Sequence, residues 1–343
     1  MPQDTVIPVT VYHDETKRED ETRLKGHVLL FVPHIATWRA GTPLFGPDER
    51  RAAPLVDVPR MIWSLRDRYD LAQKRLHFSK IGGRKWTRFD AGHRSIAELA
   101  ANILRSKPTR ELPVPFSLKV AVMFYGPDAD LSLYGGSSQE RTLRHDETVL
   151  RMLLKGAAHF LFPERTRLSL VELVTDGLPA HRTLSESRVL WQLAVDGTAG
   201  RTALRSNVEL PAELRVRPHS SDHKSHERGS TADGDSQFLQ LADLYLGAIS
   251  RACFDPTGDW PSPPAIETQP VLKKDVITHP IRSVLQKQSR GAGFRNNGHY
   301  RSFSVGRVAF SGREVSFRRL GPRLVDHTLP TPQLDLSWSD DER

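Results

Sequence analysis

Short apolar runs along the chain predict β-strands, and longer segments between them have the three- and four-residue spacing of amphipathic helices. The first run, residues 6–12, is rich in β-branched residues and ends at His13 and Asp14, where polar residues take over. A charged stretch at 17–25 separates it from a second run at 26–32, so the two predict an antiparallel hairpin. Further strands are expected at 76–81, 116–125, 168–175 and 214–217.

Helical spacing predicts helices at 56–71, at 143–162, at 185–195 and from Ser236 onward. Another helix is expected to begin at Ser95, with Glu98 completing a capping box. The polar residues 219–235 are expected to form a loop. This alternation of strands and helices favours an α/β fold.

The last third of the chain differs in composition from the rest. Several prolines predict a linker at 255–270 after a globular domain at 1–254. The next segment, 271–325, contains twelve Lys or Arg residues and two acids, and its residues 300–320 predict a β-hairpin. An acidic tail follows at 326–343. Because the formal net charge of the whole chain is only +8, the positive excess lies in this basic extension.

Composition excludes several classes of protein. The chain has 343 residues, of which 38% are hydrophobic, which is enough to build a large core. No apolar run approaches the ~20 residues of a transmembrane helix, and no secretory signal precedes the first strand, so we expect a cytoplasmic protein without a membrane partner. Cys253 is the only cysteine, which excludes an intramolecular disulfide, and we expect it in the core.

Three aspartates are the main candidates for catalytic chemistry. Asp14 and Asp176 each follow a predicted strand, where open α/β sheets present functional groups, and Asp243 interrupts the apolar pattern of a predicted helix. Carboxylates held close together repel one another unless cations neutralise them, and an all-oxygen ligand set favours Mg²⁺ or Mn²⁺. Two such ions about 3.5–4 Å apart support in-line attack on phosphorus, which is the chemistry of nucleases.

Structural alternatives remain open for some of these residues. Asp176 with Gly177 is a common turn pair, and Glu15 with Thr16 can begin a hairpin loop. Three histidines have a spacing that suits zinc, but the surrounding Ser- and Asp-rich composition favours a polar loop. These histidines are His219, His223 and His226.

Three short motifs resemble the domain-of-unknown-function 3800 family, and they cover roughly residues 6–254. They are Tyr12-His13-Asp14-Glu15, Leu76-His77-Phe78-Ser79-Lys80, and Gln240-Leu241-Ala242-Asp243-Leu244 followed by Gly247-Ala248. The resemblance implies a ribonuclease-H-like fold, which is a mixed sheet flanked by helices, here with a basic C-terminal extension. Lys74 and Arg75 stand where members of this family often have an acid.

The resemblance also implies an activity, namely a divalent-metal-dependent nuclease that hydrolyses DNA or RNA. Asp14, Asp176 and Asp243 would be the catalytic residues and would bind Mg²⁺ or Mn²⁺. Candidates for a further ligand are Glu15, Asp222 and Asp235. The resemblance leaves room for a protein partner within a larger defence or mobile-element assembly.

Basic residues are expected to contact the phosphates of the nucleic acid. They are Lys80 and, in the basic extension, Arg301, Arg307, Arg313, Arg318 and Arg319. Phenylalanines between these arginines offer stacking surfaces for bases, or pack inward while the arginines face water. The alternative to a nuclease is a non-catalytic nucleic-acid-binding or scaffold subunit, which the lack of an evident fourth acid favours.

Overall fold

The computed structural model contains a mixed β-sheet. It describes residues 5–16, 25–33, 58–72, 74–83, 85–104, 118–126, 131–162, 166–176, 208–209, 215–222, 231–253, 272–290, 302–311 and 314–319. The strands are β1 (Thr5–Glu15), β2 (Lys25–Pro33), β3 (Lys119–Tyr125), β4 (Thr166–Thr175), β5 (Val208–Glu209), β6 (Arg215–Pro218), β7 (Phe303–Ser311) and β8 (Glu314–Arg319). They lie in the order β5-β4-β1-β2-β3-β7-β8, and β6 also pairs with β4.

The directions of the strands determine which strand ends lie at the same edge of the sheet. Strands β1, β2 and β3 are antiparallel neighbours, so the hairpin expected at the start of the chain is confirmed. On its other side β1 pairs with β4 in parallel, and the backbone N–H of Asp176 donates to the carbonyl of His13. The carboxyl ends of β1 and β4 therefore lie at the same edge of the sheet.

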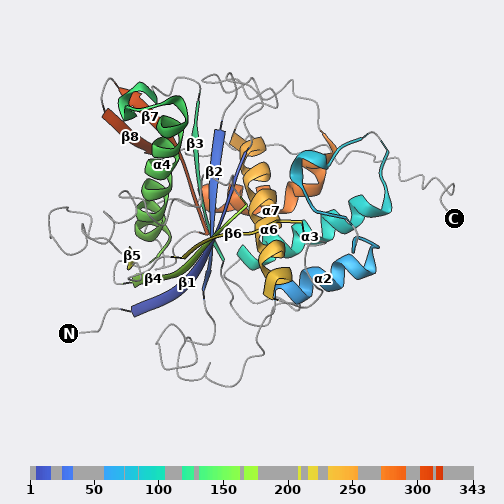
Figure 1. The fold of residues 1–343 in the computed structure, drawn as a ribbon. Helices are drawn as coiled ribbons and strands as arrows, with labels where there is room; N and C mark the ends of the chain where they lie inside the picture. Colours follow the sequence, from blue (N-terminus) through green and yellow to red (C-terminus); the bar gives the residue numbers. More distant parts are fainter. Residues whose placement is uncertain are drawn as a thin grey trace.

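Helices cover both faces of this sheet (Figure 1). They are α2 (Val58–Arg68), α3 (Arg88–Leu104), α4 (Ser138–Leu161), α6 (Thr231–Cys253) and α7 (Lys273–Arg290), with short 3₁₀ turns η2 (Phe78–Lys80) and η3 (Leu131–Tyr134). Helix α4 packs on one face, and α2, α3, α6 and α7 lie on the other (Figure 1). The expected α/β class, a mixed sheet flanked by helices, is therefore confirmed.

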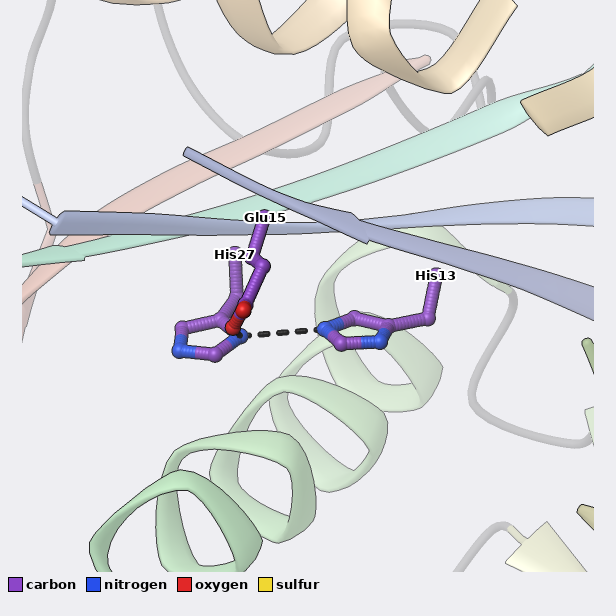
Figure 2. Close-up of side chains that lie close together, drawn as sticks. All are labelled: His13, Glu15 and His27. Atoms are coloured by element: carbon purple, nitrogen blue, oxygen red, sulfur yellow. Dashed lines mark hydrogen bonds and ion pairs between the residues drawn. The ribbon is translucent and has the colours of Figure 1, made fainter. Parts of the chain in front are cut away.

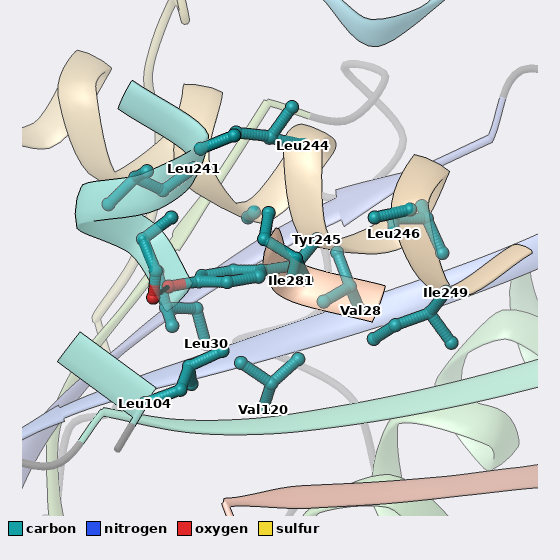
Figure 3. Close-up of a cluster of buried hydrophobic side chains, with 14 of the residues drawn as sticks. Val28, Leu30, Leu104, Val120, Leu241, Leu244, Tyr245, Leu246, Ile249 and Ile281 are labelled. Atoms are coloured by element: carbon teal, nitrogen blue, oxygen red, sulfur yellow. Dashed lines mark hydrogen bonds between the residues drawn. The ribbon is translucent and has the colours of Figure 1, made fainter. Parts of the chain in front are cut away.

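Alternation along the strands divides the core into two layers. Tyr12 and Val28 point to the face covered by α6, whereas Val11 and Leu29 point to the face covered by α4. On the α6 side, Tyr245 is fully buried and donates its hydroxyl to the carbonyl of Ala100 at 2.8 Å, within an apolar cluster (Figure 3). The same alternation places consecutive residues of β1 in different chemical environments.

Two of the expected local elements are wrong. Residues 76–81 form no strand but an extended segment and the η2 turn, because their backbone N–H groups bond side chains of α6. Ser95 does not begin a helix, since α3 starts at Arg88. The reciprocal cap is made by Thr87 and Asp90, whose backbone N–H groups bond each other's side chains.

Helix α6 begins at Thr231, inside the expected polar loop, while β6 lies where a strand was expected. The expected helix at 185–195, the linker at 255–270 and the tail at 326–343 lie outside the described residues. None of the helices in the described ranges has the length and apolarity required to span a bilayer.

The basic C-terminal segment belongs to the same sheet and core as the preceding residues. Its hairpin is present, because β7 and β8 pair antiparallel, but β7 also pairs in parallel with β3. Ile277 and Ile281 of α7 are fully buried in the core that α3 and α6 share. The structure thus places residues 272–319, as far as they are described, within the main fold rather than in a separate extension.

A buried histidine of α3 should make the stability of the fold depend on pH. Both ring nitrogens of His93 are buried without a hydrogen-bond partner in the described part of the chain, and burial lowers the pKa of this residue to about 4. The unfolded chain binds the proton near pH 6.5, so stability is full above that pH and is lost as the pH falls toward 4. The negative charge of Asp90 opposes this lowering of the pKa, whereas the positive charges of Arg66 and Lys273 add to it.

When the pH falls from 7 to 5, the unfolding free energy of the wild-type protein should decrease because His93 is buried in its neutral form. We expect this decrease to be about 2 kcal/mol smaller in the His93→Gln variant. Urea unfolding at the two pH values measures this difference. Equal pH dependence of the two proteins would show that His93 is not the group responsible.

Candidate carboxylate site

Carboxylates from three separate elements lie toward the carboxyl edge of β1 and β4, but their oxygens are not all within 4.8 Å of one another. Asp14 shares the face of β1 that carries Tyr12, which faces α6, and Asp176 follows the end of β4. Asp14 is almost fully buried, and burial raises its pKa well above the usual value. The charges of Asp243 and Asp176 raise it further.

Asp176 is held by a cation and by a neighbouring loop. Arg75 lies with its Nη2 3.0 Å from one carboxylate oxygen. Ser221, which follows β6, donates its backbone N–H to the other oxygen at 3.0 Å, and its hydroxyl donates at 2.5 Å to the oxygen that Arg75 contacts. Arg75 also contacts the Ser221 hydroxyl, so these three residues form one polar group.

Asp243 holds the segment that was expected to be a strand. Its Oδ2 accepts from the backbone N–H of Phe78 at 2.6 Å and lies 3.0 Å from Nδ1 of His77. Its side chain is 19% exposed, so the carboxylate is partly open to solvent. A carboxylate stands within the apolar pattern of α6 because it binds the segment 76–81, which crosses this helix and is called the crossing segment below.

Gly247 lets the crossing segment approach α6. A Cβ at this position would lie only 2.1 Å from the ring of Phe78. We therefore expect Gly247→Ala to displace Phe78 and His77 from Asp243, and to destabilise the protein by about 1–3 kcal/mol although alanine is the better helix former. Gly82→Ala is the matched control, because nothing lies within 4 Å of its added Cβ. Thermal unfolding of both variants measures the effect, and equal stability would contradict this packing argument.

Gln240 joins the elements that carry the site. Its carbonyl oxygen accepts from the backbone N–H of Leu76 at 2.8 Å and from the guanidinium of Arg66, and its amide donates to the carbonyl of Ser221 at 2.5 Å. Arg66 is completely buried and also donates to Gln237 at 2.9 Å and to the carbonyl of Lys74 at 2.6 Å. Burial lowers the pKa of Arg66 to about 10, so it remains charged at neutral pH.

Two of the candidates for a further acidic ligand, Glu15 and Asp235, bind other partners. Glu15 points to the opposite face of β1, where it pairs with Lys25 at 3.2 Å. Asp235 accepts the hydroxyl of Tyr12 and pairs with Arg217, each at 2.7 Å. At Asp222, the backbone N–H bonds Ser220, and it is the preceding Ser221 that contacts Asp176.

Some of the expected phosphate-binding residues lie near this edge. Lys80 is exposed in η2, three residues after His77. Arg307 lies on β7 in register with Phe124, which pairs with Gly26 at the same sheet edge, about 14 Å from β1 for three strand spacings of about 4.8 Å. Arg318 and Arg319 occupy β8, opposite Arg307 and Gly306, while Arg301 and Arg313 lie outside the described residues.

The structure describes two of the remaining sequence candidates, His219 and Cys253. His219 bonds the carbonyl of Thr175 through its backbone N–H, and its ring lies 3.3 Å from Arg217, while His223 and His226 lie outside the described residues. Cys253 packs against the core, and burial raises the pKa of its thiol to about 12. A protonated thiol of this kind is a poor nucleophile.

The donor set suits a hard divalent cation. Asp14, Asp176 and Asp243 offer oxygens only, and a cation would remove the repulsion that raises the pKa of Asp14. In the sequence, Arg75 stands only as a departure from the pattern of the resembled family, and no local pattern marks Arg66 or Ser221 as part of a site. Comparison with protein-family models, curated proteins and solved structures finds no match to this chain.

Proposed function

We propose that this chain is a divalent-metal-dependent nuclease in which Asp14, Asp176 and Asp243 hold Mg²⁺ or Mn²⁺. The observation that carries the proposal is the parallel pairing of β1 with β4, which brings Asp176 and the buried Asp14 to the same sheet edge, where the charge of Asp243 on α6 also acts on Asp14. A ribonuclease-H-like fold is part of the proposal. The strand order β3-β2-β1-β4-β5 supports this fold. In it, β2 is antiparallel to both β1 and β3, and β4 and β5 run parallel to β1.

The residues around the carboxylates have separate tasks in this proposal. When bound, the metal ions would supply a nucleophilic water and charge neutralisation at the phosphate. His77 and the backbone N–H of Phe78 orient Asp243, and Ser221 orients Asp176. Arg75, which is partly exposed, is close enough to exchange its contact with Asp176 for a phosphate oxygen. Lys80 and Arg307 would bind the nucleic acid on either side of the cleaved bond.

Purified protein incubated with labelled single- and double-stranded DNA and RNA tests the proposal. We expect cleavage of at least one substrate with Mn²⁺ or Mg²⁺, no cleavage with EDTA, and loss of cleavage in the Asp243→Asn variant. Binding of nucleic acid without cleavage under all conditions would contradict the nuclease.

A non-catalytic nucleic-acid-binding subunit is the second candidate. The ion pair between Arg75 and Asp176 favours it, because a cation already neutralises one of the three acids. The variant Arg75→Gln separates the two functions: a nuclease with this pair should bind metal more tightly in the variant, whereas a binding subunit should only lose affinity for nucleic acid.

A further inference from the structure

A second polar cluster lies on the opposite face of β1 from Asp14. His13 and Glu15 alternate with Asp14 along β1, and Glu15 lies directly opposite His27 of β2 in the strand register. Figure 2 shows the three side chains together on the side of the sheet where α4 packs. His13 and His27 are fully buried, and the side chain of Glu15 is 7% exposed.

The geometry of this cluster matches a transition-metal site. Each of the three residues offers one ligand atom, and these atoms lie within 4.8 Å of one another. The His13 Nε2 and His27 Nδ1 atoms face each other at 3.0 Å, and Glu15 Oε2 lies 3.8 Å from His27 Nδ1. Two imidazoles that bind one tetrahedral ion at about 2.0–2.1 Å bring their ligating nitrogens to a similar separation.

The outer nitrogens of both rings lie close to oxygen atoms. His13 Nδ1 lies 2.9 Å from the hydroxyl of Thr175, and His27 Nε2 lies 3.3 Å from a carboxylate oxygen of Asp146 on α4, although that contact lacks the geometry of a hydrogen bond. A proton on each outer nitrogen leaves lone pairs on the two nitrogens that face each other. Carboxylate or hydroxyl partners on the far side of the ring are the usual support of metal-binding histidines.

We propose that His13, Glu15 and His27 form a buried site for a zinc-type transition-metal ion, separate from the carboxylate site. Imidazole ligands favour such ions over Mg²⁺, in contrast to the all-oxygen set around Asp14. The proposal does not depend on nuclease activity. Two of the ligands, His13 and Glu15, flank Asp14 on β1, and the third, His27, lies on β2. The ion would therefore link the two strands and hold the end of β1 that carries Asp14.

Charges around the cluster are compatible with a cation. Lys25 lies 3.2 Å from Glu15 and 3.1 Å from Asp146, so two carboxylates face one ammonium group. Tyr125 donates its hydroxyl to Asp146 at 2.9 Å and keeps that carboxylate in place. With neutral histidines, these ionised groups sum to one negative charge, and Lys25 can remain with Asp146 when Glu15 turns toward the ion.

The experiment measures Zn²⁺ bound per chain after dialysis against excess Mg²⁺, together with the visible spectrum of the Co²⁺-loaded protein. We expect one Zn²⁺ per chain and the intense spectrum of a tetrahedral or five-coordinate Co²⁺ ion. His27→Gln should lose the ion, and Asp243→Asn should retain it. Thr175→Val should weaken Zn²⁺ binding about 10- to 100-fold, because it removes the partner that orients His13.

Two results would overturn the proposal. The first is wild-type protein that binds no Zn²⁺ above background, which would mean that the two histidines and Thr175 form a metal-free group of buried polar residues. The second is Zn²⁺ that is lost in Asp243→Asn and kept in His27→Gln, which would place the ion at the carboxylates. If His27→Gln does not fold, X-ray absorption of the Zn²⁺-loaded wild-type protein decides, because this site requires two imidazole ligands.

Discussion

The Asp14→Asn variant is expected to be more stable than the wild-type protein in the absence of metal, and inactive as a nuclease. The asparagine keeps the shape of the side chain but removes the charge that burial, Asp243 and Asp176 all disfavour. We expect a gain of about 1–3 kcal/mol in unfolding free energy, the range for one buried polar group that lacks compensation. Activity should fall about 100- to 1,000-fold, because metal stabilisation of the transition state is worth several kcal/mol.

Denaturant unfolding in EDTA and cleavage assays in Mn²⁺ measure the two effects. Asp275→Asn is the matched control, since burial of that carboxylate is outweighed by hydrogen bonds from Arg251 and the backbone of Leu272, and its pKa is lowered. Asp275→Asn should therefore destabilise the protein. Asp14→Asn would contradict the account if it destabilised the metal-free protein to the same extent.

The Gln240→Leu variant is expected to lose about 3–5 kcal/mol of unfolding free energy, although Gln240 is not among the residues proposed to bind metal or nucleic acid. Leucine would leave the Leu76 N–H, the Ser221 carbonyl and one N–H group of the buried Arg66 without their partner. Each buried group that loses its partner costs about 1–3 kcal/mol. Cleavage should fall as well, because the segments that carry His77 and Ser221 lose their attachment to α6.

Gln237→Leu is the control for this variant. Gln237 lies on the same helix and accepts one hydrogen bond from Arg66 at 2.9 Å, but it does not bond the site segments. We expect a smaller loss, about 1.5–3 kcal/mol for one hydrogen bond to a charged group, and nearly unchanged cleavage. Equal losses of stability and activity in the two variants would argue against a special role for Gln240.

The elements that position the site could be predicted where a single local pattern decides them. The apolar run before Asp14, the strand before Asp176 and the apolar spacing around Asp243 each predict a strand or helix, and β1, β4 and α6 are present. The charge interaction among these residues depends on the parallel pairing of β1 with β4. That pairing joins residues more than 150 positions apart, and no local pattern encodes it.

Other parts of the site could not be predicted, because their partners are distant in sequence. Residues 76–81 have the apolar composition of a strand, but side chains of Gln240 and Asp243 take up their backbone N–H groups. Glu15 is adjacent to Asp14 and carries the same charge, yet the strand alternation turns it to the other face, beside His27. The basic C-terminal segment looked separate by composition, but β7 extends the sheet beside β3.

Mn²⁺ binding followed by electron paramagnetic resonance tests the central claim most directly, because it requires no substrate. Zn²⁺ is added first to occupy any histidine site, and Mn²⁺ is then titrated into wild-type protein, Asp14→Asn and Asp243→Asn. The account predicts that wild-type protein depletes the free Mn²⁺ signal and that each variant binds at least about 10-fold more weakly. Equal Mn²⁺ binding by all three proteins, or none by the wild-type protein, would contradict a metal site at Asp14, Asp176 and Asp243.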